Sequence, residues 1–199
     1  YEQIIAKIQN WIKDYVTSAK VNGVVVGISG GIDSAVTTTL CTKALGVKNV
    51  IGLGLPCSSV LNDLNDAENL ANKLGIKFIK IELTSVYNEF IRISSPLFES
   101  NQIAMANLKP RLRMMTLYYV GQSLGKFIVA GTSNRTELAI GYFTKYGDGG
   151  VDFEPIGDLY KCEVREIIKK PPSAGLWEGQ TDEAEIGLTY EVLDEMIFR

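Results

Sequence analysis

The sequence predicts an α/β protein, with a single-domain Rossmann-like parallel sheet and helices on both faces. Short apolar runs alternate with longer amphipathic segments over residues 1–130, as in proteins where strands alternate with helices. The first of these runs, Val24–Ile28, is almost entirely aliphatic, as expected of a strand buried on both faces. The chain has 199 residues, of which 46% are hydrophobic, and this suits one domain with a sizeable core.

The elements follow in order along the chain. Residues 1–19 carry apolar side chains at every third or fourth position, the spacing of a helix with one buried face. Thr84 is the expected N-terminal cap of its helix. The predicted strands are Val24–Ile28, Val50–Leu55, Ile76–Ile81 and Phe127–Ala130. The predicted helices are Tyr1–Ala19, Ser34–Leu45, Leu64–Leu74, Thr84–Ile93, Met105–Leu124 and Thr189–Phe198.

Two later segments break this pattern. TKYGDGGVDFEPIGDL (residues 144–159) and PPSAGLWEGQTDEAEIG (171–187) are rich in glycine and acidic residues. Structured loops of this length are often functional. We expect residues 1–199 to form one domain without a glutaminase domain, because the chain is short and lacks the histidine that a Cys-His or Ser-His-Asp centre needs.

Composition excludes several kinds of site. Without histidine there is no imidazole-ligated metal, so a metal would need oxygen ligands, which suits Mg²⁺. The net charge of −3 shows no basic surplus, and we expect neither nucleic acid nor a membrane as a partner. The three cysteines are scattered and form no C-x-x-C pair. A reducing cytoplasm is therefore the expected location.

Three polar loops follow predicted strands: residues 27–34, 56–59 and 131–134. Ligands of parallel sheets bind beyond the carboxyl ends of the strands. We therefore expect these loops to share one site.

The first of these loops reads GISGGIDS. It lacks the lysine of a Walker A loop and the spacing of a dinucleotide fingerprint. Its glycines can present backbone amides to phosphate at a helix start, and Ser29 and Ser34 add hydroxyl donors. Asp33 would repel a bare phosphate, but with Mg²⁺ in between it becomes a metal ligand. The alternative is a glycine turn in which Asp33 only caps the following helix.

Four motifs together resemble one family. SGGIDS resembles the pyrophosphatase loop of enzymes that split ATP into AMP and pyrophosphate. The other three are NLKPRLRMM, GTSNRTELAIGYFTKYGDGGVDFEPIGDLYKCEV and PPSAGLWEGQTDEAEIG. Together they resemble ammonia-dependent NAD synthetase, in order and over most of the chain. The resemblance implies that ATP adenylates the nicotinate carboxylate of deamido-NAD and that ammonia displaces AMP.

The resemblance also implies residue roles. Asp33 and Lys161 would be catalytic, and Asp33 and Glu137 would ligate Mg²⁺. The residues expected to bind ATP are Gly27, Ile28, Ser29, Gly30, Gly31, Ile32, Asp33, Ser34, Thr132, Lys161 and Ser173. Those expected at deamido-NAD are Arg111, Lys145 and Asp152, with Tyr142 and Asp148 lining the same region. The family is homodimeric, so a homodimer is expected here.

Each role has a simpler alternative. Lys161 is alternatively a solvated charge at a helix start, and Glu137 an ordinary acid in a first helical turn. Arg111 and Arg113 are two residues apart on the helix, so they should face different ways. Both could belong to a solvated face.

The sequence departs from the family pattern in three places. Residues could be missing near Lys170-Pro171 and Ser59–Asp63, and the sequence stops at Arg199, before a basic segment that the family uses near the dinucleotide. Other enzymes with the pyrophosphatase loop fit less well, because tRNA-modifying members usually have a basic face, sulfur-transferring ones paired cysteines, and GMP or asparagine synthetases extra domains. The non-enzymatic alternative is a nucleotide-binding sensor.

Overall fold

The computed structural model describes residues 2–58, 61–97, 99, 101–168, 194 and 197. Its sheet has four parallel strands in the order β3-β2-β1-β4. The strands are β1 (Gly23–Gly27), β2 (Val50–Gly54), β3 (Lys77–Lys80) and β4 (Phe127–Ala130). The predicted fold class, a parallel sheet with helices, is confirmed.

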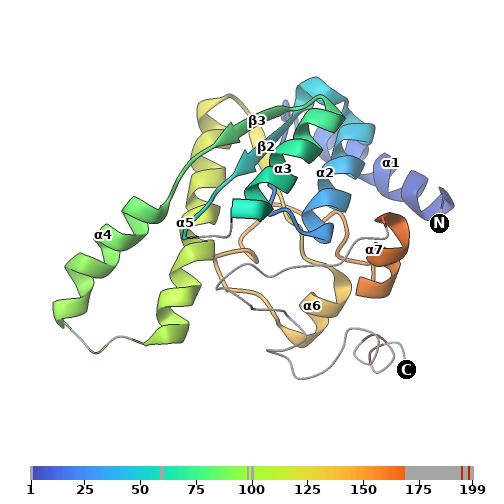
Figure 1. Cartoon of the computed structure of the whole chain (residues 1–199). Helices are drawn as coiled ribbons and strands as arrows, with labels where there is room; N and C mark the ends of the chain where they lie inside the picture. The colour runs from blue at the N-terminus through green and yellow to red at the C-terminus, as the bar shows by residue number, and fades with distance from the viewer. Residues whose placement is uncertain are drawn as a thin grey trace.

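Helices connect and flank these strands (Figure 1). They are α1 (Glu2–Ser18), α2 (Ile32–Leu45), α3 (Leu61–Leu74), α4 (Thr84–Ser94), α5 (Gln102–Ser123), α6 (Arg135–Ile140) and α7 (Lys161–Ile168). Two short 3-10 turns lie at Val47–Asn49 and Ser95–Leu97. The predicted helix Thr189–Phe198 lies outside the described residues, except for Asp194 and Ile197.

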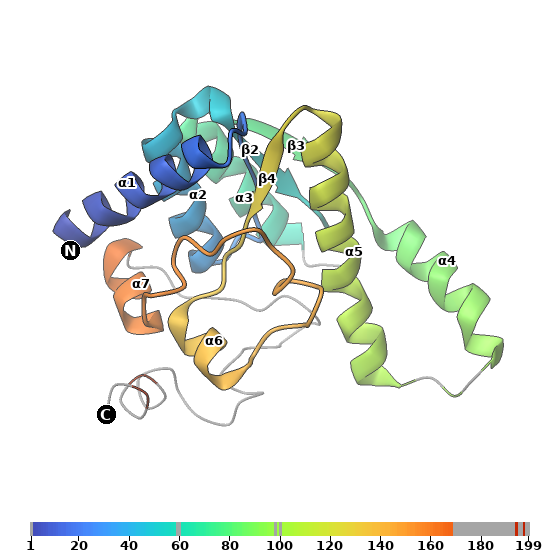
Figure 2. The ribbon, with the colours of Figure 1, turned by 180° about the vertical axis from the view of Figure 1, so that it is seen from behind.

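The alternation of side chains along β1 places helices on both faces of the sheet. Val24 and Val26 point into a core shared with α1, α2, α3 and α7. Val25 points the other way, into a core shared with α5. The view from behind shows α1 and α2 on one side of the strands and α5 on the other (Figure 2). Both faces of the central strand β1 are therefore buried, which explains its aliphatic sequence.

The predicted starts of α2, α3 and α5 are wrong; α3 begins at Leu61 rather than Leu64. The predicted start of α4 at Thr84 is confirmed, but its predicted cap is wrong. α2 begins at Ile32, and Gly31 takes the cap position without a side-chain bond, so Asp33 is not a cap. Thr84 does not cap α4: its hydroxyl accepts from Ser58 N at 2.8 Å. α5 begins at Gln102, because the side chain of Asn101 accepts from Ala104 N at 3.0 Å.

The outer edge of β4 is covered by the first glycine-rich segment. The backbone of Phe153 forms a parallel bridge to Ala130. The carboxylate of Asp152 accepts from Val129 N at 2.7 Å, and Asp152 N donates to the Val129 carbonyl at 3.0 Å. Covering an edge strand in this way removes unpaired backbone groups. It also attaches the segment to the end of the sheet where ligands bind.

No described helix has the length and apolar character needed to cross a membrane. All three cysteines are free thiols.

The two ends of β1 give a stability test. A Cβ at Gly23 would overlap the carbonyl of Asn49, whereas at Gly27 it would meet only the Leu117 side chain at 3.5 Å. We expect Gly23→Ala to destabilise the fold by roughly 1–3 kcal/mol through overpacking. For a chain of this size the thermal midpoint falls by roughly 2–4 °C per kcal/mol. Gly27→Ala is the control, and equal midpoints for both variants would contradict this packing.

Candidate active site

The loop between β1 and α2 has a backbone that only glycine permits. Gly30 has φ +88°, and a Cβ there would lie 2.5 Å from the carbonyl oxygen of Asp63. A positive φ and a close backbone contact both exclude other residues. Sequence and structure thus agree that this loop is a tight turn that leads into a helix.

Hydroxyl groups hold the loop together. The amide of Gly31 donates to Ser29 Oγ at 3.2 Å, and the amide of Ser29 donates to Ser34 Oγ at 3.2 Å. Ser34 Oγ in turn donates to the Gly31 carbonyl at 2.9 Å. Groups of the loop itself therefore fix its shape, beside the amino end of a helix of 14 residues, where an anion is favoured.

A buried ion cluster lies beside this loop. Lys161 Nζ is 2.6 Å from Asp33 Oδ2 and 3.3 Å from Glu137 Oε1. Lys161 is fully buried, so it is not the solvated charge of the simpler alternative. The three residues come from the starts of α2, α6 and α7 and are 24 to 128 positions apart. The structure therefore brings together the predicted catalytic pair and the predicted metal ligands.

Asn134 joins two of these charges. Its Nδ2 donates to Asp33 Oδ1 at 3.1 Å, which connects the glycine loop to the loop after β4. It also caps α6: Asn134 Oδ1 accepts from Glu137 N at 3.1 Å, and Glu137 Oε2 accepts from Asn134 N at 3.2 Å. This reciprocal capping fixes the side chain of Glu137. Glu137 is thus more than an ordinary first-turn acid.

The cluster fits a divalent cation. One ammonium group already contacts both Asp33 and Glu137, so a single cation can bridge the two carboxylates. In the described part of the chain no group of three or more acidic or cysteine side chains is placed to hold a metal. Two carboxylates suit Mg²⁺, which takes its remaining ligands from phosphate oxygens and water.

Glu154 is a third carboxylate of this region. Its Oε2 accepts from Ser133 N at 3.0 Å, and it lies against Gly131. Desolvation raises the pKa of Glu154 to about 8; Glu137 and Asp148 add to the effect, while the bonds from Ser133 oppose it. Glu154 thus supports the loop that carries Thr132, which is itself half-buried.

The predicted substrate residues are only partly joined by contacts. Arg111 Nε donates to the Lys145 carbonyl at 3.2 Å, and the Lys145 ammonium lies 5.1 Å from the Tyr146 ring centre. Asp148 Oδ1 accepts from Thr144 N at 3.0 Å within the same turn. The Arg111 bond attaches the residue 144–150 turn to α5, and the other two contacts lie within the turn.

Other predicted site residues have structural contacts. Tyr142 N, just after the end of α6, donates to the Glu137 carbonyl, and Asp152 binds the edge of β4.

The two arginines of α5 do face different ways: Arg113 Nε donates to the Leu55 carbonyl at 3.0 Å, whereas Arg111 reaches Lys145. Leu83 N donates to the Pro56 carbonyl, which joins the second loop to the start of α4. Ser173 lies outside the described residues.

Comparison with known proteins places the chain in a family. The sequence pattern of NAD synthase matches residues 4–198. The chain belongs to the NAD synthase family. It is 47% identical to the NH(3)-dependent NAD(+) synthetase of Carboxydothermus hydrogenoformans over an alignment 210 positions long, which covers 99% of this chain and 85% of that protein.

Solved structures agree with this membership. NMN synthetase from Francisella tularensis superposes with a TM-score of 0.91 at 37% identity, covering 98% of this chain and 85% of that one. NH3-dependent NAD synthetase from Campylobacter jejuni, in complex with nitrate, superposes with a TM-score of 0.77 at 35% identity, covering 100% and 86%.

Two residues of this NAD synthase family site were missed in the sequence. Asn134 had a visible signal, because N-R-T-E has the spacing of a capping box. Its contact with Asp33, 101 positions away, had none. Glu154 had no local signal either, since its role comes from the fold that lays it on Gly131.

Glu154 gives a pH-dependent prediction. Its folded-state pKa lies above the ordinary value of 4.5. Its contribution to stability is therefore complete below pH 4.5 and is lost as the pH rises through 8. Glu154→Gln keeps an acceptor for Ser133 N but cannot ionise. We expect the variant to gain thermal stability relative to the parent between pH 5 and pH 9. The difference in thermal midpoint between variant and parent at pH 5 is the control. If this difference does not widen toward pH 9, the raised pKa is contradicted.

Proposed function

We propose that this chain amidates the nicotinate carboxylate of deamido-NAD with ammonia, using ATP and Mg²⁺, and forms NAD, AMP and pyrophosphate through an adenylated intermediate. The observation that carries this proposal is the buried contact of Lys161 with Asp33 and Glu137 beside the glycine loop. A sensor would need the loop alone. A buried lysine held in place by two carboxylates is suited to stabilise negative charge on a leaving group.

Asp33 and Glu137 are the residues that would hold Mg²⁺. When bound, the metal supplies positive charge that screens the triphosphate and favours departure of pyrophosphate. Asn134 orients both carboxylates: its Nδ2 donates to Asp33 Oδ1, and its backbone N donates to Glu137 Oε2. The position of the two ligands is thus set by the fold.

Lys161 supplies a second positive charge. Its ammonium group is fully buried, where electrostatic interactions are stronger than in water. In this role it stabilises negative charge on the phosphate oxygens that leave as pyrophosphate. Gly27–Ser34 hold the ATP phosphates with backbone amides and hydroxyls, and Thr132 and Ser173 complete the ATP contacts.

The proposed deamido-NAD region is formed by Arg111, Lys145, Tyr142, Asp148 and Asp152. Arg111 reaches from α5 to the residue 144–150 turn, so binding residues on both elements are held together. Its guanidinium has a fork that can grip phosphate oxygens.

The nitrogen source in this proposal is free ammonia, in keeping with the 47% identity to an NH(3)-dependent NAD(+) synthetase. We place the reaction in the cytoplasm, where a reducing environment keeps thiols such as the three free cysteines reduced.

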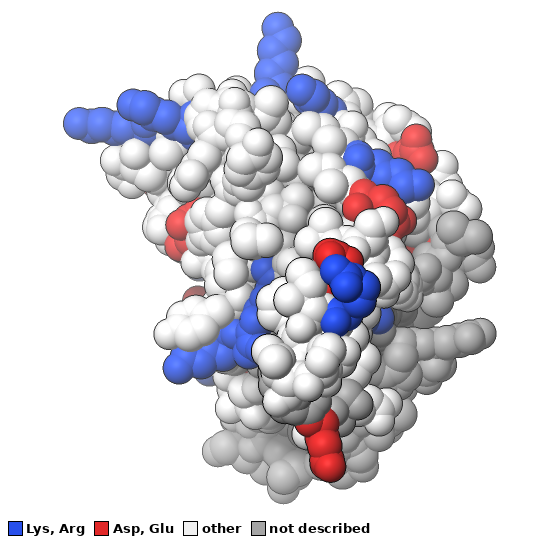
Figure 3. Space-filling model, turned by 90° about the vertical axis from the view of Figure 1, so that its left-hand side faces the viewer, with Lys and Arg blue, Asp and Glu red and all other residues white. Residues whose placement is uncertain are grey.

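We also propose a homodimer that forms through α4 and α5. In Figures 1 and 2, α4 and the amino-terminal part of α5 project from the body of the molecule, while the rest of α5 lies against the sheet. The side view onto α4 and α5 shows mainly uncharged residues with scattered charges (Figure 3).

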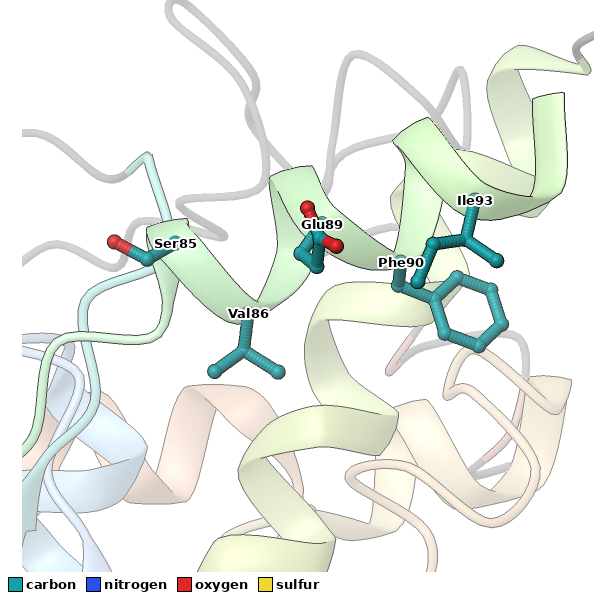
Figure 4. Close-up of a pocket in the computed structure, with 5 residues that line it drawn as sticks. All are labelled: Ser85, Val86, Glu89, Phe90 and Ile93. Carbon is teal, nitrogen blue, oxygen red and sulfur yellow. The ribbon is translucent and has the colours of Figure 1, made fainter.

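An open hollow of about 430 Å³ on α4 is lined by Val86, Phe90 and Ile93 (Figure 4). Phe90 is 52% exposed and Ile93 60%. Contiguous apolar surface of this kind is typical of an interface.

The reaction is tested by pyrophosphate release from ATP with Mg²⁺ and ammonium. We expect release only with deamido-NAD, and NAD in equal amount. Asp33→Ala should lower the rate by at least roughly a hundredfold, because it removes a proposed ligand of the Mg²⁺ whose charge favours departure of pyrophosphate. Asp14→Ala, on the exposed face of α1, is the matched control.

Other outcomes separate the alternatives. ATP binding without release would favour the sensor. Release with another acceptor would keep the loop chemistry and overturn the substrate. Nicotinate mononucleotide belongs among the acceptors tested, given the similarity to NMN synthetase.

The interface is tested by sedimentation. We expect Phe90→Glu to shift the parent dimer to monomers, since a charge buried in an apolar contact is strongly unfavourable. Val47→Glu introduces the same charge at another exposed apolar position and should leave the dimer intact. A monomeric parent would refute the dimer, and a dimeric Phe90→Glu variant would refute this interface.

A further inference from the structure

The active-site cluster depends on how the first turns of α6 and α7 are placed. Glu137 lies in the first turn of α6, and Lys161 is the first residue of α7. They are 24 positions apart, so the chain between them does not by itself set their separation. A hydrogen bond from Lys161 N to Thr136 Oγ1, at 3.0 Å, joins the backbone of α7 to the start of α6.

A buried carboxylate from the far end of the sequence bridges the same two helix starts. Asp194 is 6% exposed. One of its oxygens accepts the hydroxyl proton of Thr136, and the other accepts from Cys162 N at 2.8 Å. Thr136 directly precedes Glu137, and Cys162 directly follows Lys161. Each contact is therefore one residue from a charged member of the cluster.

These bonds form a closed set. The Thr136 hydroxyl accepts from Lys161 N and donates to Asp194, which also accepts from Cys162 N. A carboxylate is favoured at a helix start, where backbone amides lack helical partners. Bonds to an ionised acceptor are also stronger than neutral ones. Such a bridge holds the two helix starts at one separation.

We propose that Asp194 is a positioning residue for the reaction: through Thr136 and Cys162 it places Glu137 and Lys161 around Asp33. The inference deepens the proposed function and rests on it. Asp194 acts through the two helices rather than through contact with a substrate.

Cys162 provides a reporter that does not need activity. It is exposed, whereas Cys41 and Cys57 are buried. Partial desolvation, followed by the contact with Asp194, raises the pKa of the Cys162 thiol to about 11. The charge of Glu163 also raises it, and a backbone bond from Glu163 lowers it; both remain when residue 194 is changed. Loss of the Asp194 charge should therefore speed thiol alkylation at a fixed pH.

The experiment compares Asp194→Asn with Asp158→Asn, the same change at an exposed site. Pyrophosphate release is measured with ATP, Mg²⁺, ammonium and deamido-NAD. We expect Asp194→Asn to lower kcat at least tenfold and to raise KM for ATP less than threefold. In a Lys161→Met background, Asp194→Asn should lower kcat less than twofold further, because the effects of substitutions in groups that act as a unit do not add.

The alkylation rate of Cys162 is followed against pH in the parent and both variants. We expect its midpoint to fall in Asp194→Asn only. If Asp194→Asn does not fold, Thr136→Val removes the same bridge, and Thr136→Ser should restore the rate.

The outcomes are distinguishable. An active parent with unchanged kcat and thiol midpoint in Asp194→Asn overturns the positioning role alone. A tenfold further loss in the Lys161→Met background also overturns it, as a general structural disturbance. A parent that releases no pyrophosphate with deamido-NAD overturns the proposed function and this inference with it, even if the thiol responds.

Discussion

The contact of the Lys161 ammonium with Asp33 and Glu137 is the interaction on which the site depends. A lysine with no exposed surface is costly to bury unless it is paired. Removing one partner of a buried pair typically costs roughly 3–5 kcal/mol, because the remaining charge is left uncompensated. The starts of three helices are therefore constrained to meet at one point beyond the carboxyl end of the sheet.

The parallel sheet makes this meeting possible. β1 is an inner strand that is buried on both faces, and the glycine loop follows it at the same edge of the sheet as the loop after β4. Asn134 then connects the two loops across 101 positions of sequence. The glycine-rich segment returns along the outer edge of β4, which brings Glu154 onto Gly131. Loops from distant parts of the chain thus converge because their strands are neighbours.

The charge balance of the site explains its chemistry. Two carboxylates and one ammonium leave a net negative charge beside a loop that is shaped for phosphate. Such a site is suited to a cation that arrives together with an anion, as Mg²⁺ does with ATP. Catalysis by preorganised charge requires that these groups do not move during the reaction. The bridge from Asp194 to both helix starts serves that requirement.

The sequence by itself determined the parallel fold, the glycine loop and the family. These follow from local patterns: a buried strand shows as an aliphatic run, and the turn at Gly30 needs glycine whatever surrounds it. The predicted start of α2 was wrong, because a cap at Gly31 without a side-chain bond leaves no signal in the sequence. Only the tertiary structure decided that Lys161 is buried, that Asn134 reaches Asp33 and that Asp194 joins α6 to α7. The physical reason is range: these contacts join residues 32 to 128 positions apart, and no local pattern encodes which distant polar groups satisfy one another.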